Sequence, residues 1–140
     1  MPQPYETGLH NTCEIGRPRK VMLHRPGREL ENLMPEHLER LLFDDIPYLK
    51  AAQEEHDAFA DCLRKNGAEV VYLADLVAET IADDNVRQEL IEEFLDESGV
   101  TGHRIRRIIQ DYFQDLRDRE LVDVMMAGLR KSEIRGFETG

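Results

Sequence analysis

Two short apolar runs with a helical pattern between them constrain the fold of this chain most. KVMLH at residues 20–24 and AEVVYL at residues 68–73 have the composition of buried strands. The residues between them repeat apolar side chains every three or four positions, as an amphipathic helix does, at Leu49, Ala52, His56, Phe59 and Leu63. Asn66-Gly67 marks the end of this helix, because glycine readily adopts the left-handed conformation that follows one. Strand, helix and strand predict a right-handed parallel crossover and therefore an α/β fold.

A two-stranded sheet is too small to be stable alone. Each core side chain left in water forgoes about 1.5–3 kcal/mol, so the sheet needs neighbours from the same chain or from a partner. The sequence ends in LRKSEIRGFETG, which has the character of a connector. We therefore expect this chain to be the N-terminal part of a longer protein, with exposed apolar sheet surface when it is made alone.

The second half of the sequence is helical throughout and acidic. MPEHLERLLF at residues 34–43 predicts one short helix in the first half, and residues 75–140 predict a bundle in which Asp118 caps the last helix. We thus predict an α/β module at 1–74 and a helical domain at 75–140 that is incomplete at its C-terminus. The apolar residues that define the bundle are Leu76, Val77, Ile81, Val86, Leu90, Ile91, Phe94, Leu95, Ile105, Ile108, Ile109, Tyr112, Phe113, Leu116, Leu121, Val124 and Met125.

Charge and composition exclude several classes of function. The formal net charge of −11 argues against a nucleic-acid or anionic-membrane partner. No apolar stretch approaches the roughly 18 residues of a membrane span, and MPQPYETGLHNT lacks the regions of a secretory signal. The two cysteines, Cys13 and Cys62, have neither disulfide-framework nor metal-site spacing. These features predict a cytoplasmic protein.

Few residues have the spacing of a catalytic or metal site. The five histidines show no ligand spacing, and we expect His56 to be a hydrogen-bonded, half-buried structural residue. Cys62 is expected to behave as a small hydrophobic residue, and Cys13 has no base near it in the sequence. Basic residues gather in RPRKVMLHRPGR, at Arg17, Arg19, Lys20, Arg25 and Arg28. Solvated strand ends or an anion site both fit this cluster.

Two adjacent aspartates, Asp44 and Asp45, interrupt the chain before the long helix. An unpaired carboxylate in a core costs several kcal/mol, so these residues must be solvated, cap a helix or bind a ligand. The best explanation is one carboxylate, with Asp45 placed for this role, that caps the helix entered through Ile46-Pro47, and one that is solvated or braces the loop.

Residues 16–81 resemble the N-terminus of bacterial arginine deiminases. The similarity runs without a gap through HRPGRELENL, LLFDDIPYL, EHDAFA and LVAETI, and residues 82–140 are similar to the helical insertion of that family. The resemblance implies a pseudo-fivefold α/β propeller of the pentein type, in which the first ββαβ module is followed by an inserted helical bundle. It also implies a cytoplasmic hydrolase that acts on the C–N bond of a linear amidine and converts L-arginine to L-citrulline and ammonia. No metal or organic cofactor is implied, and the full-length protein is expected to be a homo-oligomer.

The resemblance also bears on individual residues. The family uses a cysteine thiolate, a histidine and carboxylates from later motifs that are absent here, so Cys13 and Cys62 are not assigned the role of nucleophile and the chain alone is predicted to be inactive. Leu42 would offer its backbone carbonyl to the bound amino acid, with Phe43, Asp44 and Asp45 supporting the loop. Two alternatives remain: a truncated relative that acts as an interaction or regulatory module, and an amidinotransferase-like enzyme, which lacks the helical insertion.

Overall fold

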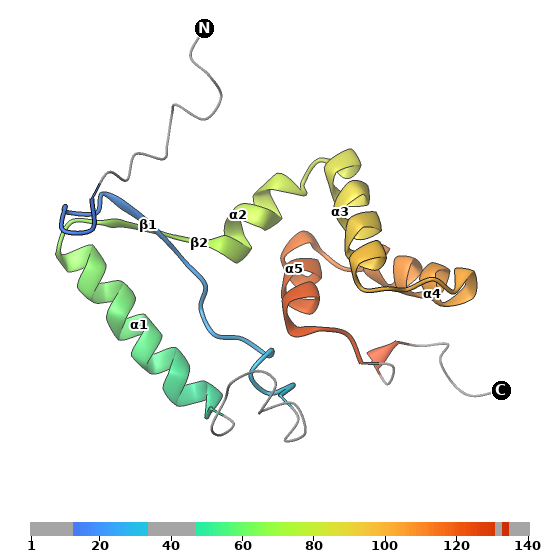
Figure 1. Ribbon diagram of the computed structural model, residues 1–140, viewed down its shortest axis with the longest axis horizontal. Coiled ribbons are helices and arrows are strands. Elements are labelled where there is room, and N and C mark those ends of the chain that lie inside the picture. Colours follow the sequence, from blue (N-terminus) through green and yellow to red (C-terminus); the bar gives the residue numbers. More distant parts are fainter. Residues whose placement is uncertain (1–12, 34–46, 131–132, 135–140) are drawn as a thin grey trace, which may run out of the picture.

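The computed structural model describes residues 13–33, 47–130 and 133–134, which contain two strands and five helices. The elements follow one another as β1 (Lys20–Leu23), α1 (Leu49–Lys65), β2 (Glu69–Tyr72), α2 (Leu73–Thr80), α3 (Asp84–Glu97), α4 (His103–Gln114) and α5 (Asp118–Ala127). Figure 1 shows β1, α1 and β2 at one end of an elongated molecule and α3, α4 and α5 at the other. The described chain is therefore a mixed α/β structure, as predicted.

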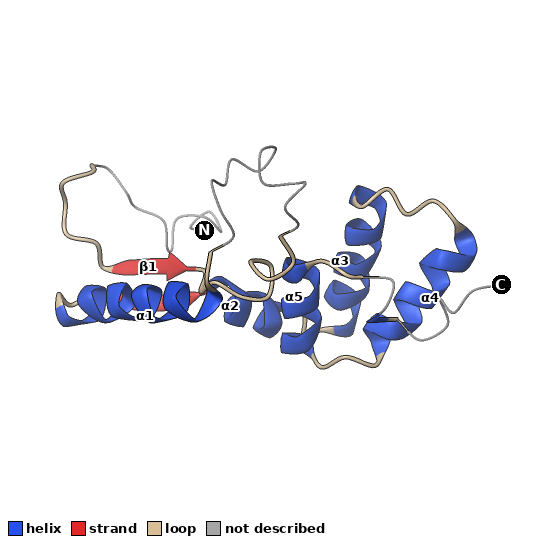
Figure 2. Ribbon diagram, turned by 90° about the horizontal axis from the view of Figure 1, so that it is seen from below, coloured by secondary structure: helices blue, strands red, loops and turns tan. Residues whose placement is uncertain are grey.

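The two strands pair in parallel, which confirms the predicted parallel pairing. Val21 lies opposite Val70 and Leu23 opposite Tyr72, and the neighbouring pair Lys20 and Glu69 forms an ion pair at 3.0 Å. α1 connects the strands and lies along one face of the sheet (Figure 2). The parallel pairing places the residues that follow β1 and β2 at the same edge of the sheet.

The strands are only half-buried, so the prediction of buried strands is wrong for the described residues. Met22 is 57% exposed and alternates in β1 with the half-buried Val21 and Leu23. Figure 2 shows no described helix or strand on the face of the sheet opposite α1. One helix covers one face, and the other face is left to solvent within this part of the chain.

The long predicted helix is present as α1, with one error in its apolar face. Ala60 is fully buried, whereas Phe59, predicted to face the sheet, is 55% exposed. The covered line runs through positions 56, 60 and 63, so Phe59 lies to one side of it. Gly67 follows the helix with φ 85°, and its N–H donates to the Arg64 carbonyl while that of Ala68 donates to the Leu63 carbonyl. These two bonds are a Schellman motif, which confirms the predicted end.

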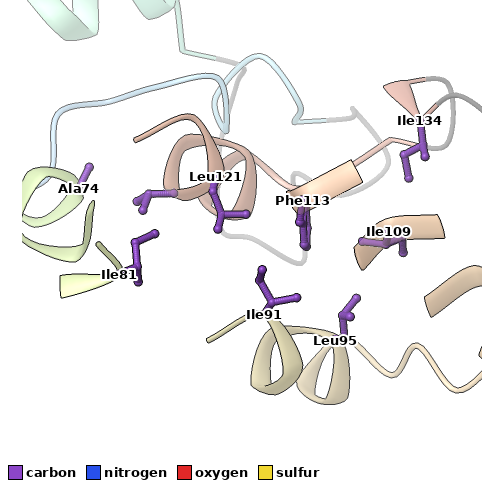
Figure 3. Packing of buried hydrophobic residues seen from close by; sticks show 9 residues of the cluster. Ala74, Ile81, Ile91, Leu95, Ile109, Phe113, Leu121 and Ile134 are labelled. Atoms are coloured by element: carbon purple, nitrogen blue, oxygen red, sulfur yellow. The ribbon is translucent and has the colours of Figure 1, made fainter. Parts of the chain in front are cut away.

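The hydrophobic core lies among the four later helices. α2 begins at Leu73, directly after β2, so the second strand is shorter than the predicted 68–73. Phe113 is completely buried and meets Phe94 edge-on, with ring centroids 5.8 Å apart. Figure 3 shows the buried side chains spread from Ala74 and Ile81 on the left, past Leu121 and Phe113, to Ile109 and Ile134 on the right. The buried members are Ala74, Ile81, Ile91, Leu95, Ile109, Phe113, Leu121, Val122 and Ile134.

A buried arginine joins three of these helices. Arg87 of α3 is 7% exposed and donates to the carbonyl oxygens of Phe113 at 2.9 Å and Leu116 at 2.6 Å, at the end of α4. It also donates to Asp118 Oδ1 at 2.5 Å. The predicted capping role of Asp118 is therefore wrong, because Arg117 is the N-cap of α5 and the Asp118 carboxylate serves Arg87 instead.

Candidate functional site

The predicted substrate-bordering residues Leu42, Phe43, Asp44 and Asp45, and the predicted short helix at 34–43, lie outside the described residues. The described chain resumes at Pro47, and Tyr48 occupies the N-cap position of α1 without a side-chain capping bond. Asp45 lies outside the described residues, so its predicted role as a cap of this helix stays a prediction. The loop-supporting role of these residues stays a prediction.

A hollow of about 230 Å³ lies among the described residues, at the edge where both strands end. The loop that follows β1 forms one wall, Gln53 of α1 and Tyr72 of β2 contribute to the lining, and α5 adds side chains from the helical part. The hollow thus lies where the α/β and helical parts meet. Its lining residues are His24, Arg25, Pro26, Gly27, Arg28, Glu29, Gln53, Tyr72, Ala74, Arg119, Asp123 and Met126.

Glu29 organises the loop after β1 from within. Its Oε1 accepts hydrogen bonds from the Gly27 N–H at 2.7 Å and from His24 Nε2 at 2.8 Å. Partial burial alone would raise the pKa of Glu29, but the hydrogen bonds from the backbone and from His24 lower it below its ordinary value. The carboxylate therefore stays ionised, and it fixes a tight turn through His24, Pro26 and Gly27.

The same loop is fastened to α1 by two contacts. Arg25 donates through Nε and Nη2 to the two carboxylate oxygens of Asp57, both at 2.8 Å. This two-bond geometry raises the pKa of Arg25 and lowers that of Asp57. Gln53 Nε2 donates to the Pro26 carbonyl at 2.9 Å. The side chains of α1 thus hold the Arg25 guanidinium in one orientation.

Three further contacts fasten the segment to the helical part. Asn32 Nδ2 donates to the Ala127 carbonyl at 2.7 Å, and Arg28 forms an ion pair with Glu133. Arg130 Nη2 donates to the Glu31 carbonyl at 3.5 Å, a longer contact. Residues 24–32 are therefore held between α1 and the far end of α5.

Arg119 of α5 closes the hollow from the helical part. Its guanidinium binds Asp123 through Nε at 3.0 Å and also pairs with Asp75 of α2. These hydrogen bonds and charges raise the pKa of Arg119. The sequence analysis did not identify four of the lining residues: Gln53, Tyr72, Arg119 and Asp123. Arg119 and Asp123 are four residues apart, a spacing that predicts a contact within one helix but not a place in the lining of a hollow.

The basic residues of RPRKVMLHRPGR fit either solvated strand ends or an anion site in the sequence, and the structure separates them. Lys20 lies at a strand end, exposed and paired with Glu69, as the solvated-end interpretation predicts. Arg25 and Arg28 instead line the hollow, where an anion site would need them.

The histidines and cysteines show no metal or nucleophilic arrangement among the described residues. No group of three or more potential metal ligands occurs in this part of the chain. His56 packs against Tyr72 with ring centroids 6.0 Å apart, but its buried Nδ1 has no hydrogen-bond partner there, so the prediction of a hydrogen-bonded histidine is wrong for this atom. The Cys62 thiol is exposed rather than packed as a hydrophobic residue. None of the described helices is long and apolar enough to cross a lipid bilayer.

Comparison with known proteins identifies the family. The family model for arginine deiminase matches residues 39–139. The chain belongs to the arginine deiminase family. The arginine deiminase of Clostridium perfringens is 53% identical over 134 residues, which cover 94% of this chain and 32% of that protein. The arginine deiminases of Streptococcus agalactiae and Streptococcus gordonii are 50% and 52% identical over 127 residues, which cover 90% of this chain and 31% of each relative. The chain thus spans about a third of the length of the arginine deiminases that it matches.

Proposed function

We propose that this chain forms the N-terminal part of an arginine deiminase, a hydrolase that converts L-arginine and water to L-citrulline and ammonia. One observation carries the proposal: over about nine-tenths of its length, this chain has about half of its residues identical to those of proteins named arginine deiminase. Half identity over so long a segment supports a shared role better than fold similarity alone would.

The proposed reaction needs a nucleophile that this chain does not supply. A cysteine thiolate attacks the guanidinium carbon, ammonia leaves, and water releases citrulline from the covalent intermediate with a histidine as acid and base. Within the described residues, the contact to the Cys62 sulfur comes from the Asn66 amide, at 3.8 Å, and neither Cys62 nor the exposed Cys13 is bonded to a histidine. We therefore assign the nucleophile and the histidine to segments outside these 140 residues.

We propose that β1, α1 and β2 belong to the first module of a pentein-type propeller, with residues 1–74 in that module and 75–140 in the helical insertion. The exposed face at Met22 supports this proposal, since further strands and helices of a propeller would bury apolar surface there. The placement of the core among α2 to α5 supports a separate helical unit.

In this proposal, the LLFDD loop borders the bound substrate. Leu42 offers a backbone carbonyl to the amino acid, and Phe43, Asp44 and Asp45 support the loop. The fixed positions of Asn32 before the loop and of α1 after it support this assignment, because both ends of the loop are then anchored.

The remaining proposals follow from the family. The substrate is L-arginine, no metal or organic cofactor takes part, and the complete protein works in the cytoplasm as a homo-oligomer. The net charge of −11 supports a small-molecule substrate over a nucleic acid or an anionic membrane.

A chimera tests the function. Residues 1–140 replace the matching segment of the Clostridium perfringens relative, and citrulline and ammonia are measured after addition of L-arginine. The matched control is the same protein with that segment deleted, and circular dichroism establishes that each protein is folded.

We expect the chimera to release citrulline and ammonia in equal amounts, and the control and the isolated 140-residue chain to release neither. A folded chimera without citrulline release would contradict the proposed function. Citrulline release by the isolated chain would contradict the assignment of the nucleophile to other segments.

A further inference from the structure

Asn66 is the one asparagine of this sequence that precedes a glycine, and it lies at the surface between α1 and β2. We propose that Asn66-Gly67 is a modification site, at which water converts the Asn66 amide to a carboxylate. The reaction is a deamidation that the chain carries out on itself. It is separate from the hydrolysis of free arginine proposed above.

The reaction consumes one water and releases one ammonia. The backbone nitrogen of Gly67 loses its proton and bonds to Cγ of Asn66, and the bond between Cγ and Nδ2 breaks as ammonia leaves. Water then opens the resulting cyclic imide at either of its carbonyl carbons. The product is aspartate or its isomer isoaspartate, in which the main chain runs through Cγ, and nothing is oxidised or reduced.

Gly67 leaves the path between the reacting groups open. A side chain at this position would crowd the attacking nitrogen, and glycine also reaches backbone conformations that other residues rarely adopt. A Cβ added at Gly67 would meet no described atom within 4 Å, so the backbone can turn there without striking a neighbour. Asn85 is exposed as well, but it precedes the β-branched Val86, whose side chain crowds the corresponding nitrogen.

Two hydrogen bonds at the end of α1 restrain the reacting groups. The Gly67 N–H donates to the Arg64 carbonyl at 2.9 Å, and Asn66 Nδ2 donates to the Cys62 carbonyl at 2.8 Å. The attacking nitrogen and the departing amide are therefore both bonded to the last turn of the helix. Exposed helix ends open at low cost in free energy, so we expect opening of this turn to set the rate.

The products weaken the junction between α1 and β2. A carboxylate at position 66 cannot donate to the Cys62 carbonyl, and it places a negative charge at the negative end of the helix dipole. Isoaspartate also adds a carbon atom to the main chain just before Ala68, which is buried and whose N–H donates to the Leu63 carbonyl. Because β2 begins at Glu69, the lengthened chain disturbs the entry into this strand.

Incubation of the purified chain at neutral pH in water enriched in heavy oxygen, followed by peptide mapping with mass spectrometry, tests the proposal. We expect Asn66 to become aspartate or isoaspartate with one heavy oxygen, while Asn85 stays unchanged. The label separates conversion during incubation from conversion during digestion. We expect conversion in the folded chain to be about tenfold slower than in urea, which corresponds to about 1.4 kcal/mol for opening a turn held by two hydrogen bonds.

The matched control is Asn66→Gln, which keeps an amide donor but needs a larger ring for the same attack, so we expect its amide to stay intact. Conversion of Asn66 in urea with none in the folded chain would overturn the proposal. Equal conversion of Asn66 and Asn85 would also overturn it, as would equal rates in the folded and unfolded chain, because the end of α1 would then not govern the reaction. The incubation contains no arginine, so its result is independent of the proposed deiminase activity.

Discussion

Replacement of Arg87 by methionine tests how the helical part is held together. The guanidinium of Arg87 is buried and binds two carbonyl oxygens at the end of α4 as well as the Asp118 carboxylate. Methionine keeps much of the aliphatic volume but removes every one of these donors. The change therefore isolates the hydrogen bonds from the packing.

The expected loss of stability depends on whether water or another donor replaces Arg87 at each of its three acceptors, the Asp118 carboxylate and the Phe113 and Leu116 carbonyl oxygens. The Asp118 side chain is 42% exposed, so water solvates it and little stability is lost there. The buried Phe113 carbonyl still accepts from the Leu116 N–H at 3.3 Å, and the Leu116 carbonyl is only partly buried, so neither acceptor is left as a fully buried unpaired group. The loss is that of hydrogen bonds from a charged donor, and we expect the free energy of unfolding to fall by about 1.5–3 kcal/mol in Arg87→Met.

Urea unfolding followed by circular dichroism measures this loss. The matched control is Arg106→Met on α4, whose guanidinium pairs with the more exposed carboxylates of Glu92 and Asp96. The control is expected to lose much less stability than Arg87→Met, because solvated ion pairs contribute little. Equal losses in the two variants, or an Arg87→Met midpoint unchanged at equal slope, would refute the role assigned to Arg87.

Three further changes test other parts of the structure. Phe113→Ala empties the centre of the core and should lower the free energy of unfolding by about 3–5 kcal/mol in urea; a loss below that of an exposed site such as Phe59→Ala would be inconsistent with the packing. Gly67→Ala should cost about 1–2 kcal/mol in the same assay through its positive φ, since no atom lies within 4 Å of the added Cβ, and a stabilised variant would show that φ is not 85°. The lowered pKa of Asp57 means that its pairing with Arg25 stabilises the fold above the unfolded pKa near 4 and is lost as pH falls through the folded value. Urea unfolding of Arg25→Gln should thus differ most from wild type at neutral pH and converge with it in acid, and a difference that is constant with pH would contradict this pairing.

Sequence patterns predicted a helix or its end correctly where contacts within one short segment determine it. The spacing of apolar residues placed α1, and Asn66-Gly67 placed its end, because a left-handed glycine after a helix satisfies the last carbonyls within the segment itself. The parallel pairing followed from the order of elements, since a strand, a helix and a short return leave few arrangements.

Contacts between distant segments could not be read from the sequence. Arg87 resembles any helical arginine, and its burial depends on how the end of α4 approaches α3. In the same way, Arg25 binds Asp57, which is 32 residues away in the sequence, and Arg119 binds Asp75, which is 44 residues away. The candidate site was thus only partly predicted: the basic cluster indicated Arg25 and Arg28, and the folded arrangement added Arg119.

We propose that this chain supplies structure to an arginine deiminase whose nucleophile lies in another segment. Acid quenching of the chimera during turnover of labelled L-arginine, followed by peptide mapping with mass spectrometry, tests it most directly. We expect a covalent label on a peptide from the relative's segment and none on the peptides that contain Cys13 or Cys62. A label on either of these two peptides, at the level of one per active protein, would contradict this proposal.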